Sequence, residues 1–145
     1  MTEEQQRQSV IDEALTWQNT PHHNGAHIKG AGVDCGWLPI MVYSAVGLMP
    51  KVEPGRYPPD FMMHRGEEWY KSIADKYGHR LPAGQLPKKG DFALYKFGRI
   101  YSHGAIVMDW PRIIHSYVGQ GVIQALGDQG QLEGRDVIFY TLWGD

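Results

Sequence analysis

The apolar positions of the chain follow two different periods, and the change falls near residue 90. In residues 3–17 they recur at helical spacing, with Glu and Gln on the opposite side, which predicts an amphipathic helix. A second helix is predicted over residues 35–48, CGWLPIMVYSAVGL, with Asp34 as its N-cap and Gly47 near its end. Pro39 falls late for a regular first turn, so we expect an irregular start. The inward positions of the first helix are Val10, Ile11, Ala14, Leu15 and Trp17.

A third helix is predicted over residues 60–77, with Asp60 as its cap. Its apolar side would carry Trp69, Ile73 and Tyr77. Segments rich in Gly and Pro separate the helices from one another and from the second half of the chain, and we expect them to be loops. These loops are TPHHNGAHIKGAG (20–32), MPKVEPGRYPP (49–59) and HRLPAGQLPKKGD (79–91).

From Asp91 onward the apolar period changes to two, which is typical of strands. The segment Trp110-Pro111-Arg112 between two of these runs indicates a hairpin. Helices followed by an antiparallel sheet predict an α+β fold. Because the chain has no internal repeat, low-complexity tract or linker, we expect residues 1–145 to form one domain. The predicted strands are DFALYKF (91–97), HGAIVMDW (103–110), RIIHSYV (112–118), GVIQAL (121–126) and RDVIFYTLW (135–143).

Composition and charge narrow the class of protein. A chain of 145 residues that is 42% hydrophobic and 21% charged can form a globular domain with its own core. The formal net charge of -2 provides no field that would attract nucleic acid or anionic lipid, so neither is expected as a partner. The N-terminal segment lacks the pattern of a signal peptide, and no apolar run approaches the ~20 residues of a membrane helix. We therefore expect no membrane insertion, and a cytoplasmic location unless another assembly carries the protein out.

The single cysteine, Cys35, lies in GVDCGWL, where a Gly-rich loop meets the second predicted helix. One cysteine cannot form an internal disulfide, and composition alone favours a small buried apolar residue. The position favours a nucleophile instead, because the dipole and free N–H groups of a helix N-terminus stabilise a thiolate. The same N–H groups can bind the oxyanion that forms on an attacked carbonyl group.

A thiolate nucleophile needs a general base, and His103 and His115 are the best placed of the seven histidines. His103 is expected at the start of an apolar strand, and His115 lies inside the next one. If a hairpin joins these strands, both rings share one face and His115 can hold the second ring nitrogen of His103. The alternative for His115 is a hydrogen-bonded core histidine. His64 and His79 are expected to be surface residues.

A metal site is the other common use of His and Cys. His22, His23 and His27, together with Cys35, form a donor set that zinc accepts. Their spacing matches no defined ligand pattern, however, and the segment is a predicted loop. We therefore expect no metal and no other cofactor. The sequence also contains no phosphate-binding loop, no GxSxG elbow and no HExxH helix.

Taken together, these blocks resemble the NlpC/P60 family of papain-like cysteine peptidases. The family's DC-small-Gly-Leu block, its GD turn, its H-[VG]-[GA]-I block and its IHA block correspond to residues 34–38, 90–91, 103–106 and 114–116. The step of twelve residues from His103 to His115 also fits the family's hairpin. The resemblance implies an α+β, papain-like fold with N-terminal helices packed on a C-terminal antiparallel β-sheet.

The resemblance also implies a role for each matching residue. Cys35 would be the nucleophile, His103 the general base and then acid, and His115 the residue that orients His103. Asp34 would help recognise the free amine of a peptidoglycan stem peptide. Members of the family hydrolyse stem peptides, commonly between D-glutamate and a diamino acid, through thiolate attack and an acyl-enzyme without a metal. We therefore expect a cysteine endopeptidase that acts on peptidoglycan stem peptides.

The site departs from the family pattern at two places. Gly36 and Trp37 follow the cysteine where the family usually has Ser and Gly, and His23 stands where a Tyr usually donates to the oxyanion. A histidine can also donate there, but only in a pH-dependent way. The candidate substrate-binding or oxyanion residues are Asp34, His22, His23, Gly36, Trp37 and Ser102.

The loop before Cys35 and the DWPRIIHSYV hairpin most resemble the subgroup encoded by tailed phages and prophages, whose members are associated with the tail tip. This resemblance implies tail-tip proteins as partners and a virion that carries the enzyme to the bacterial cell wall. The departures leave two alternatives open. One is a structural or binding module of a phage tail with weak or no activity, and the other is a Cys–His amidase or acyltransferase that acts on a different acyl substrate.

Overall fold

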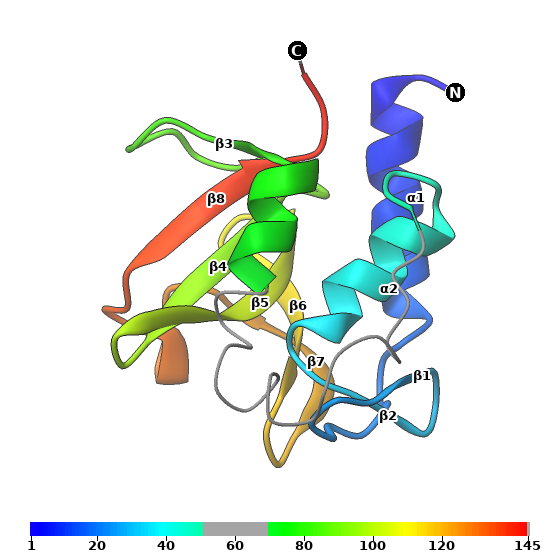
Figure 1. The fold of residues 1–145 in the computed structure, drawn as a ribbon, viewed down its shortest axis with the longest axis vertical. Coiled ribbons are helices and arrows are strands. Elements are labelled where there is room, and N and C mark those ends of the chain that lie inside the picture. The colour runs from blue at the N-terminus through cyan, green and yellow to red at the C-terminus, as the bar shows by residue number, and fades with distance from the viewer. Residues whose placement is uncertain (51–69, 145) are drawn as a thin grey trace.

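The computed structural model describes residues 1–50 and 70–144 and places the α-helices on one face of an antiparallel sheet (Figure 1). The helices in this range are α1 (Glu3–Leu15), α2 (Trp37–Ala45), residues 70–77 and the short 3-10 helix η2 (Gly130–Leu132). A separate pair of short strands consists of β1 (His27–Ile28) and β2 (Gly32–Val33). The main sheet contains β3 (His79–Arg80), β4 (Phe92–Phe97), β5 (Ile100–Asp109), β6 (Arg112–Tyr117), β7 (Gly121–Leu126) and β8 (Val137–Thr141).

The strand order of the main sheet is β3-β8-β4-β5-β6-β7, and every neighbouring pair is antiparallel. Strands β4 to β7 follow one another directly, and β8 returns to pair with the free side of β4. Asp109 pairs with Arg112 across Trp110 and Pro111, so the predicted hairpin is present. The predicted α+β class is confirmed.

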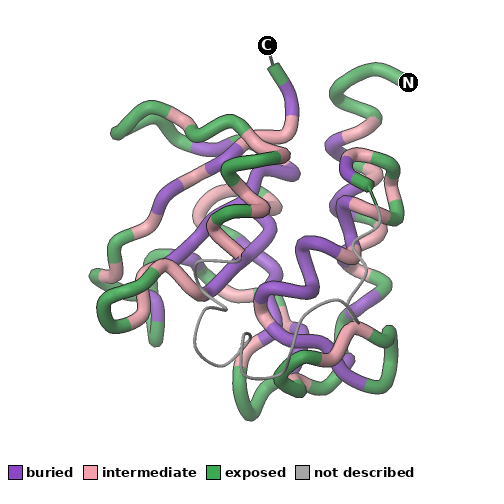
Figure 2. The backbone as a smooth tube through the Cα atoms, in the orientation of Figure 1, coloured by how far each residue is buried: buried purple, intermediate pink, exposed green. Residues whose placement is uncertain are grey.

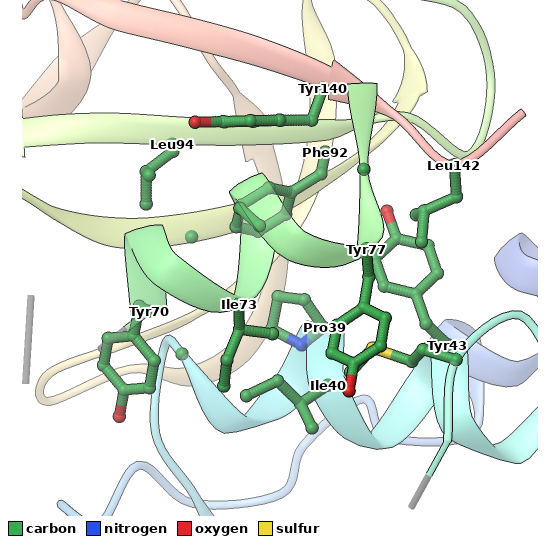
Figure 3. A pocket seen from close by; sticks show the side chains of 15 residues that line it. Pro39, Ile40, Tyr43, Tyr70, Ile73, Tyr77, Phe92, Leu94, Tyr140 and Leu142 are labelled. Carbon is green, nitrogen blue, oxygen red and sulfur yellow. The ribbon is translucent and has the colours of Figure 1, made fainter. Parts of the chain in front are cut away.

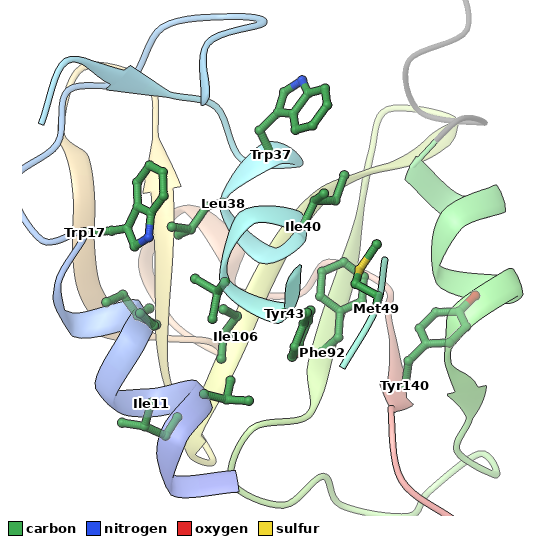
Figure 4. Close-up of a cluster of buried hydrophobic side chains, with 14 of the residues drawn as sticks. Ile11, Trp17, Trp37, Leu38, Ile40, Tyr43, Met49, Phe92, Ile106 and Tyr140 are labelled. Atoms are coloured by element: carbon green, nitrogen blue, oxygen red, sulfur yellow. The ribbon is translucent and has the colours of Figure 1, made fainter. Parts of the chain in front are cut away.

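The sheet is apolar on both faces. Because successive residues of a strand point to opposite faces, each central strand contributes to two separate cores. The face under α1 and α2 carries Phe92, Leu94 and Ile106 in the larger core, where Trp17, Trp37 and Tyr43 also lie (Figure 4). The other face carries Ala93, Tyr95, Ala105, Val107 and Ile113, which pack with Leu132 of η2. Burial is therefore concentrated in the central strands and along most of α2 (Figure 2).

Helix α1 is fixed at its start by a capping box, in which the Thr2 side chain accepts from the Gln5 backbone and the Gln5 side chain accepts from Thr2. Arg7 of the same helix is buried and pairs with Asp91 at 2.9 Å, which joins α1 to the turn before β4. The helix ends two residues earlier than predicted, at Leu15. Trp17 lies just beyond its end, yet is only 3% exposed.

Several predicted boundaries shift in the structure. Helix α2 covers Trp37–Ala45 rather than 35–48, and Gly47, with φ of +80°, lies in the turn that follows. Strand β5 begins at Ile100, so His103 lies inside the strand and not at its start. The strand extends because it keeps pairing with β4 beyond an irregularity near Ser102.

The predicted loops 20–32 and 79–91 contain three short strands, β1, β2 and β3, which form because their backbones find partners. The third predicted helix is helical over residues 70–77, where Ile73 and Tyr77 are half-buried against the larger core. Asp60, His64 and Trp69 lie outside the described residues, as do residues 51–59 of the predicted connector.

Candidate active site

The segment that leads into α2 is held by the carboxylate of Asp34. Its Oδ1 accepts from the backbone N–H groups of Gly36 at 3.0 Å and Trp37 at 2.8 Å. Asp34 thus binds the first donors of the helix as predicted, but α2 begins at Trp37, so Gly36 and not Asp34 occupies its N-cap position. Asp34 Oδ2 accepts from the N–H of Gly25 at 2.7 Å, which ties the preceding loop to the helix. Asp34 is 6% exposed, and these bonds satisfy a buried charge. A substrate amine would reach this carboxylate only by displacing a donor.

Cys35 lies between this cap and strand β5. Its Sγ donates to the carbonyl oxygen of Ser102 at 3.5 Å. Burial raises the pKa of the thiol to about 12, and the neighbouring Asp34 carboxylate contributes, so the thiol is protonated at neutral pH. Within residues 1–50 and 70–144 the backbone N–H of Cys35 has no acceptor, so it is available to an oxyanion.

His103 and His115 form a hydrogen-bonded pair across the β5–β6 hairpin. His103 Nε2 and His115 Nδ1 are 2.8 Å apart, and the ring planes meet at 84°. Both rings are buried. The sequence therefore predicted correctly that the hairpin brings the two imidazoles together. Nδ1 of His103 has no hydrogen-bond partner in the described part of the chain, so this nitrogen is the one that can accept a proton.

The electrostatics of the pair favour neutral rings. Burial lowers the pKa of His103 to about 3, and the neighbouring His115, His22 and Arg135 contribute. Burial also lowers the pKa of His115 to about 4. A protonated thiol and a neutral imidazole can react by general-base catalysis, in which the proton leaves as the sulfur attacks. The pKa shifts of Cys35 and His103 thus favour a neutral thiol beside a neutral imidazole over a thiolate–imidazolium pair.

The Cys35 thiol and the His103 imidazole lie in different surroundings next to β5. Gly104 faces α2, because a Cβ at this position would lie 3.1 Å from the carbonyl oxygen of Cys35. His103 shares the other face of β5 with Ala105 and Val107, and its ring packs against Phe97 with centroids 5.1 Å apart. Among the described residues, no hydrogen bond joins the Cys35 thiol to the His103 ring.

Of the two adjacent loop histidines, His22 is the one that contacts the sheet. Ser116 Oγ donates its only proton to the Val33 carbonyl oxygen at 2.7 Å, so it accepts from His22 Nδ1 at 3.0 Å. His23, which occupies the position of the family's tyrosine, is exposed. His22 Nε2 also lies 3.3 Å from Asn24 Oδ1, so both ring nitrogens of His22 have partners.

Tyr70 is a site residue that sequence reasoning missed. Its hydroxyl lies 3.1 Å from both carboxylate oxygens of Asp34, and a Cβ at Gly36 would overlap its ring. Burial raises the pKa of the phenol, with contributions from Asp34 and Cys35. The glycine after the cysteine is therefore explained by a tyrosine that arrives from a distant helix. No local pattern signals this contact, because 36 residues separate Tyr70 from Asp34.

The other departure, Trp37, belongs to the larger core. It is 2% exposed, and its ring lies edge-on to His27 with centroids 4.9 Å apart. In the described residues no three His, Cys, Asp or Glu side chains gather as they would around a metal ion. Of the donor set weighed for zinc, His27 packs on Trp37 and His22 binds Ser116.

An apolar pocket opens beside Gly36 and Gly104, the two glycines next to Cys35. Its walls come from α2, the helix at residues 70–77, β4 and β8, and Tyr70, Ile73 and Phe92 project into it (Figure 3). The pocket offers a ligand apolar contacts and few polar partners.

Among the helices in the described range, none has the length and apolar character needed to cross a membrane.

Comparison with solved structures identifies the class of fold. The NlpC/p60 domain of the peptidoglycan hydrolase SagA matches with a TM-score of 0.63 and 19% identity, over 91% of this chain and 96% of that one. RipD from Mycobacterium tuberculosis, described as a non-catalytic NlpC/p60 domain protein adapted to peptidoglycan binding, matches with a TM-score of 0.62 and 16% identity, over 95% and 98%.

An NLP/P60-family protein similar to a lipoprotein, from Staphylococcus aureus, matches with a TM-score of 0.66 and 16% identity. The match covers 99% of this chain but only 43% of that protein. A scan against models of protein families and a search of curated proteins found no match. The chain thus has the papain-like α+β fold of NlpC/P60 domains.

Proposed function

We propose that this protein is a cysteine endopeptidase that hydrolyses peptidoglycan stem peptides. The observation that carries the proposal is the hydrogen bond of 2.8 Å between His103 and His115. His103 follows Ser102 in β5, and the carbonyl oxygen of Ser102 contacts the Cys35 thiol. A nucleophile at a helix N-terminus, a base, and a third group that holds the base are the parts of a thiol hydrolase. The NlpC/P60 fold supports a role on peptidoglycan.

In the proposed reaction, Cys35 turns from the Ser102 carbonyl oxygen toward Nδ1 of His103. This nitrogen accepts the thiol proton while Sγ attacks the carbonyl carbon of the amide. The backbone N–H of Cys35 stabilises the oxyanion. His103 then protonates the leaving amine as the C–N bond breaks, and later activates the water that hydrolyses the thioester. His115 keeps the ring of His103 in place during both steps.

The bond between D-glutamate and a diamino acid is the proposed site of cleavage, and association with a phage tail tip is the proposed setting. Both rest on the sequence resemblance around Cys35 and the β5–β6 hairpin. Mass spectrometry of the peptide products identifies the bond that is cut. Proteomics of tail particles purified from a strain that produces this chain tests the setting, and absence of the protein from the tails would exclude it.

A second candidate is a peptidoglycan-binding module without turnover. Two observations favour it: the thiol donates to Ser102 rather than to the His103 ring, and burial raises the pKa of the Cys35 thiol to about 12. RipD is described as a non-catalytic protein of the same fold. This candidate expects iodoacetamide to label Cys35 no faster than it labels free cysteine.

The deciding experiment incubates purified muropeptides with the wild type and with Cys35→Ala, and analyses the products by mass spectrometry. The hydrolase proposal expects cleavage by the wild type and none by the variant. Binding of muropeptides without cleavage, together with slow labelling, would support the non-catalytic candidate. Rapid labelling without peptide cleavage would point to an amidase or acyltransferase with another acyl substrate.

A further inference from the structure

Arg135 lies on the His103 side of the sheet with its side chain held in one orientation. Its guanidinium carbon lies 3.7 Å from the centroid of the Phe97 ring, within the range of a cation–π contact. Its Nε donates to the carbonyl oxygen of Gln131 at 2.7 Å, and one terminal nitrogen reaches the Lys96 carbonyl oxygen at 3.5 Å. Stacking and hydrogen bonding therefore order the side chain before any ligand arrives.

This ordered guanidinium has no anionic partner within residues 1–50 and 70–144. The contrast with Arg7 is informative, because Arg7 is paired with both Glu3 and Asp91. Arg135 is half-buried, so its charge is partly removed from water without a counter-charge. A guanidinium has five N–H donors, and those of Arg135 that face away from the backbone remain available.

The position of Arg135 connects it to the candidate active site. The Phe97 ring contacts both the guanidinium and the imidazole of His103, with 5.1 Å between the centroids of Phe97 and His103. Burial is the main cause of the low pKa of His103, and the charge of Arg135 contributes, so the two groups are within electrostatic reach. Tyr117 borders the same imidazole, with ring centroids 5.5 Å apart.

We propose that Arg135 binds a carboxylate of the substrate and so determines specificity for an acidic group beside His103. The guanidinium can donate two parallel N–H bonds to the two oxygens of a carboxylate, and its stacked orientation already presents these donors. This inference rests on the proposed function, since stem peptides carry a free carboxylate or its carboxamide on the glutamyl residue. The carboxamide has the same shape without the charge, so the site would distinguish the two forms.

The test measures binding in the Cys35→Ala background, where no turnover interferes. The probes are a synthetic L-Ala-γ-D-Glu-diamino acid tripeptide with a free α-carboxylate on glutamate and the same peptide with an α-carboxamide. Calorimetry should show that the acid binds about tenfold or more tightly than the amide, in line with a charge-assisted pair. Arg135→Gln should abolish this difference, and Arg135→Lys should keep only part of it.

Arg99→Gln is the matched control, because Arg99 is an exposed arginine in the turn between β4 and β5 and should keep the full preference. Thermal unfolding of Arg135→Gln verifies that the variant is folded. Equal affinity for acid and amide, absence of binding by both, or a preference that survives Arg135→Gln would overturn the inference. If the wild type cleaves the acid and the amide with equal efficiency, the hydrolase proposal is supported and the carboxylate-binding role of Arg135 is wrong. If the preference depends on Arg135 but neither peptide is cleaved, the carboxylate-binding role is supported and the hydrolase proposal is wrong.

Discussion

Strand β5 presents two unlike surroundings to the residues that the proposed chemistry needs. On the α2 side, Gly104 leaves room for Cys35, which sits against the strand backbone beside a capped helix start. On the other side, His103 and His115 form a hydrogen-bonded pair surrounded by aromatic rings. Cys35 is positioned by the close approach of two backbones, whereas His103 is positioned by a buried hydrogen bond between side chains.

This difference shows that the pKa values of the proposed nucleophile, Cys35, and of the proposed base, His103, have separate causes. The pKa of the thiol is raised by burial and by the Asp34 carboxylate, whereas the pKa of His103 is lowered by burial and by its neighbours, including Arg135. Each of these influences favours the neutral form of its group, so the proposed reaction starts from a neutral thiol and a neutral imidazole. Variants on one side of β5 should therefore change the properties of Cys35 or of His103 separately, and cleavage rate and stability can be measured for each.

The largest expected effect comes from removing the base. His103→Asn should lower stem-peptide cleavage by about 10²–10⁴-fold, the range typical of general-base catalysis. His115→Asn should lower it less, because an amide can still hydrogen-bond to His103 Nε2. Mass spectrometric rates on muropeptides measure both effects.

His79→Asn is the matched control, since His79 is an exposed histidine of β3 with no proposed role in the site. Its rate should stay close to that of the wild type. If His103→Asn cleaves as fast as this control, His103 has no role in the reaction, and the His103–His115 pair has only a structural role.

The pH dependence of stability should come mainly from the His103 side. Burial lowers the pKa of His103 to about 3 and that of His115 to about 4, below the value of about 6.5 in an unfolded chain. Between these limits the unfolded state binds more protons, so the free energy of unfolding rises with pH. Stability is therefore complete above about pH 6.5 and is lost as the pH falls toward 3–4, by an amount on the order of a few kcal/mol.

Urea unfolding at a series of pH values measures this slope. The double variant His103→Gln, His115→Gln should flatten the slope between pH 4 and 6.5, whereas His23→Gln should leave it unchanged. An unaltered slope in the double variant would show that other groups control acid unfolding and that the buried pair titrates normally.

The sequence predicted that helices precede the sheet, because the apolar period changes along the chain. It also predicted that His103 and His115 lie together, because a single hairpin joins their strands. It did not predict which face of β5 packs against α2. The alternation in SHGAIVMDW separates His103 from Gly104, but both faces of this strand are apolar, so the pattern contains no sign of which one meets the helices. The contacts of Tyr70 with Asp34 and of Arg135 with Phe97 were missed for a related reason, since each joins segments that are distant in the sequence.

The Cys35 side can be tested through Tyr70 and Gly36. Tyr70→Phe removes the hydroxyl that donates to the buried Asp34 carboxylate, and it should lower the free energy of unfolding by about 1–3 kcal/mol. Gly36→Ala should cost about as much, because its Cβ would overlap the Tyr70 ring. Urea unfolding measures both, and Lys71→Ala, which breaks only an exposed pair with Asp75, should change it by less than about 1 kcal/mol.

A double-mutant cycle shows whether the two effects share one cause. If overlap with the ring is the reason for Gly36, then Gly36→Ala should cost much less in a Tyr70→Ala background than in the wild type, since the ring is gone. Equal costs in the two backgrounds would mean that Gly36 is required for the helix start itself and that Tyr70 is incidental to it. The glycine after the nucleophile would then reflect the α2 cap alone, and the two sides of β5 would each be set by their own local contacts.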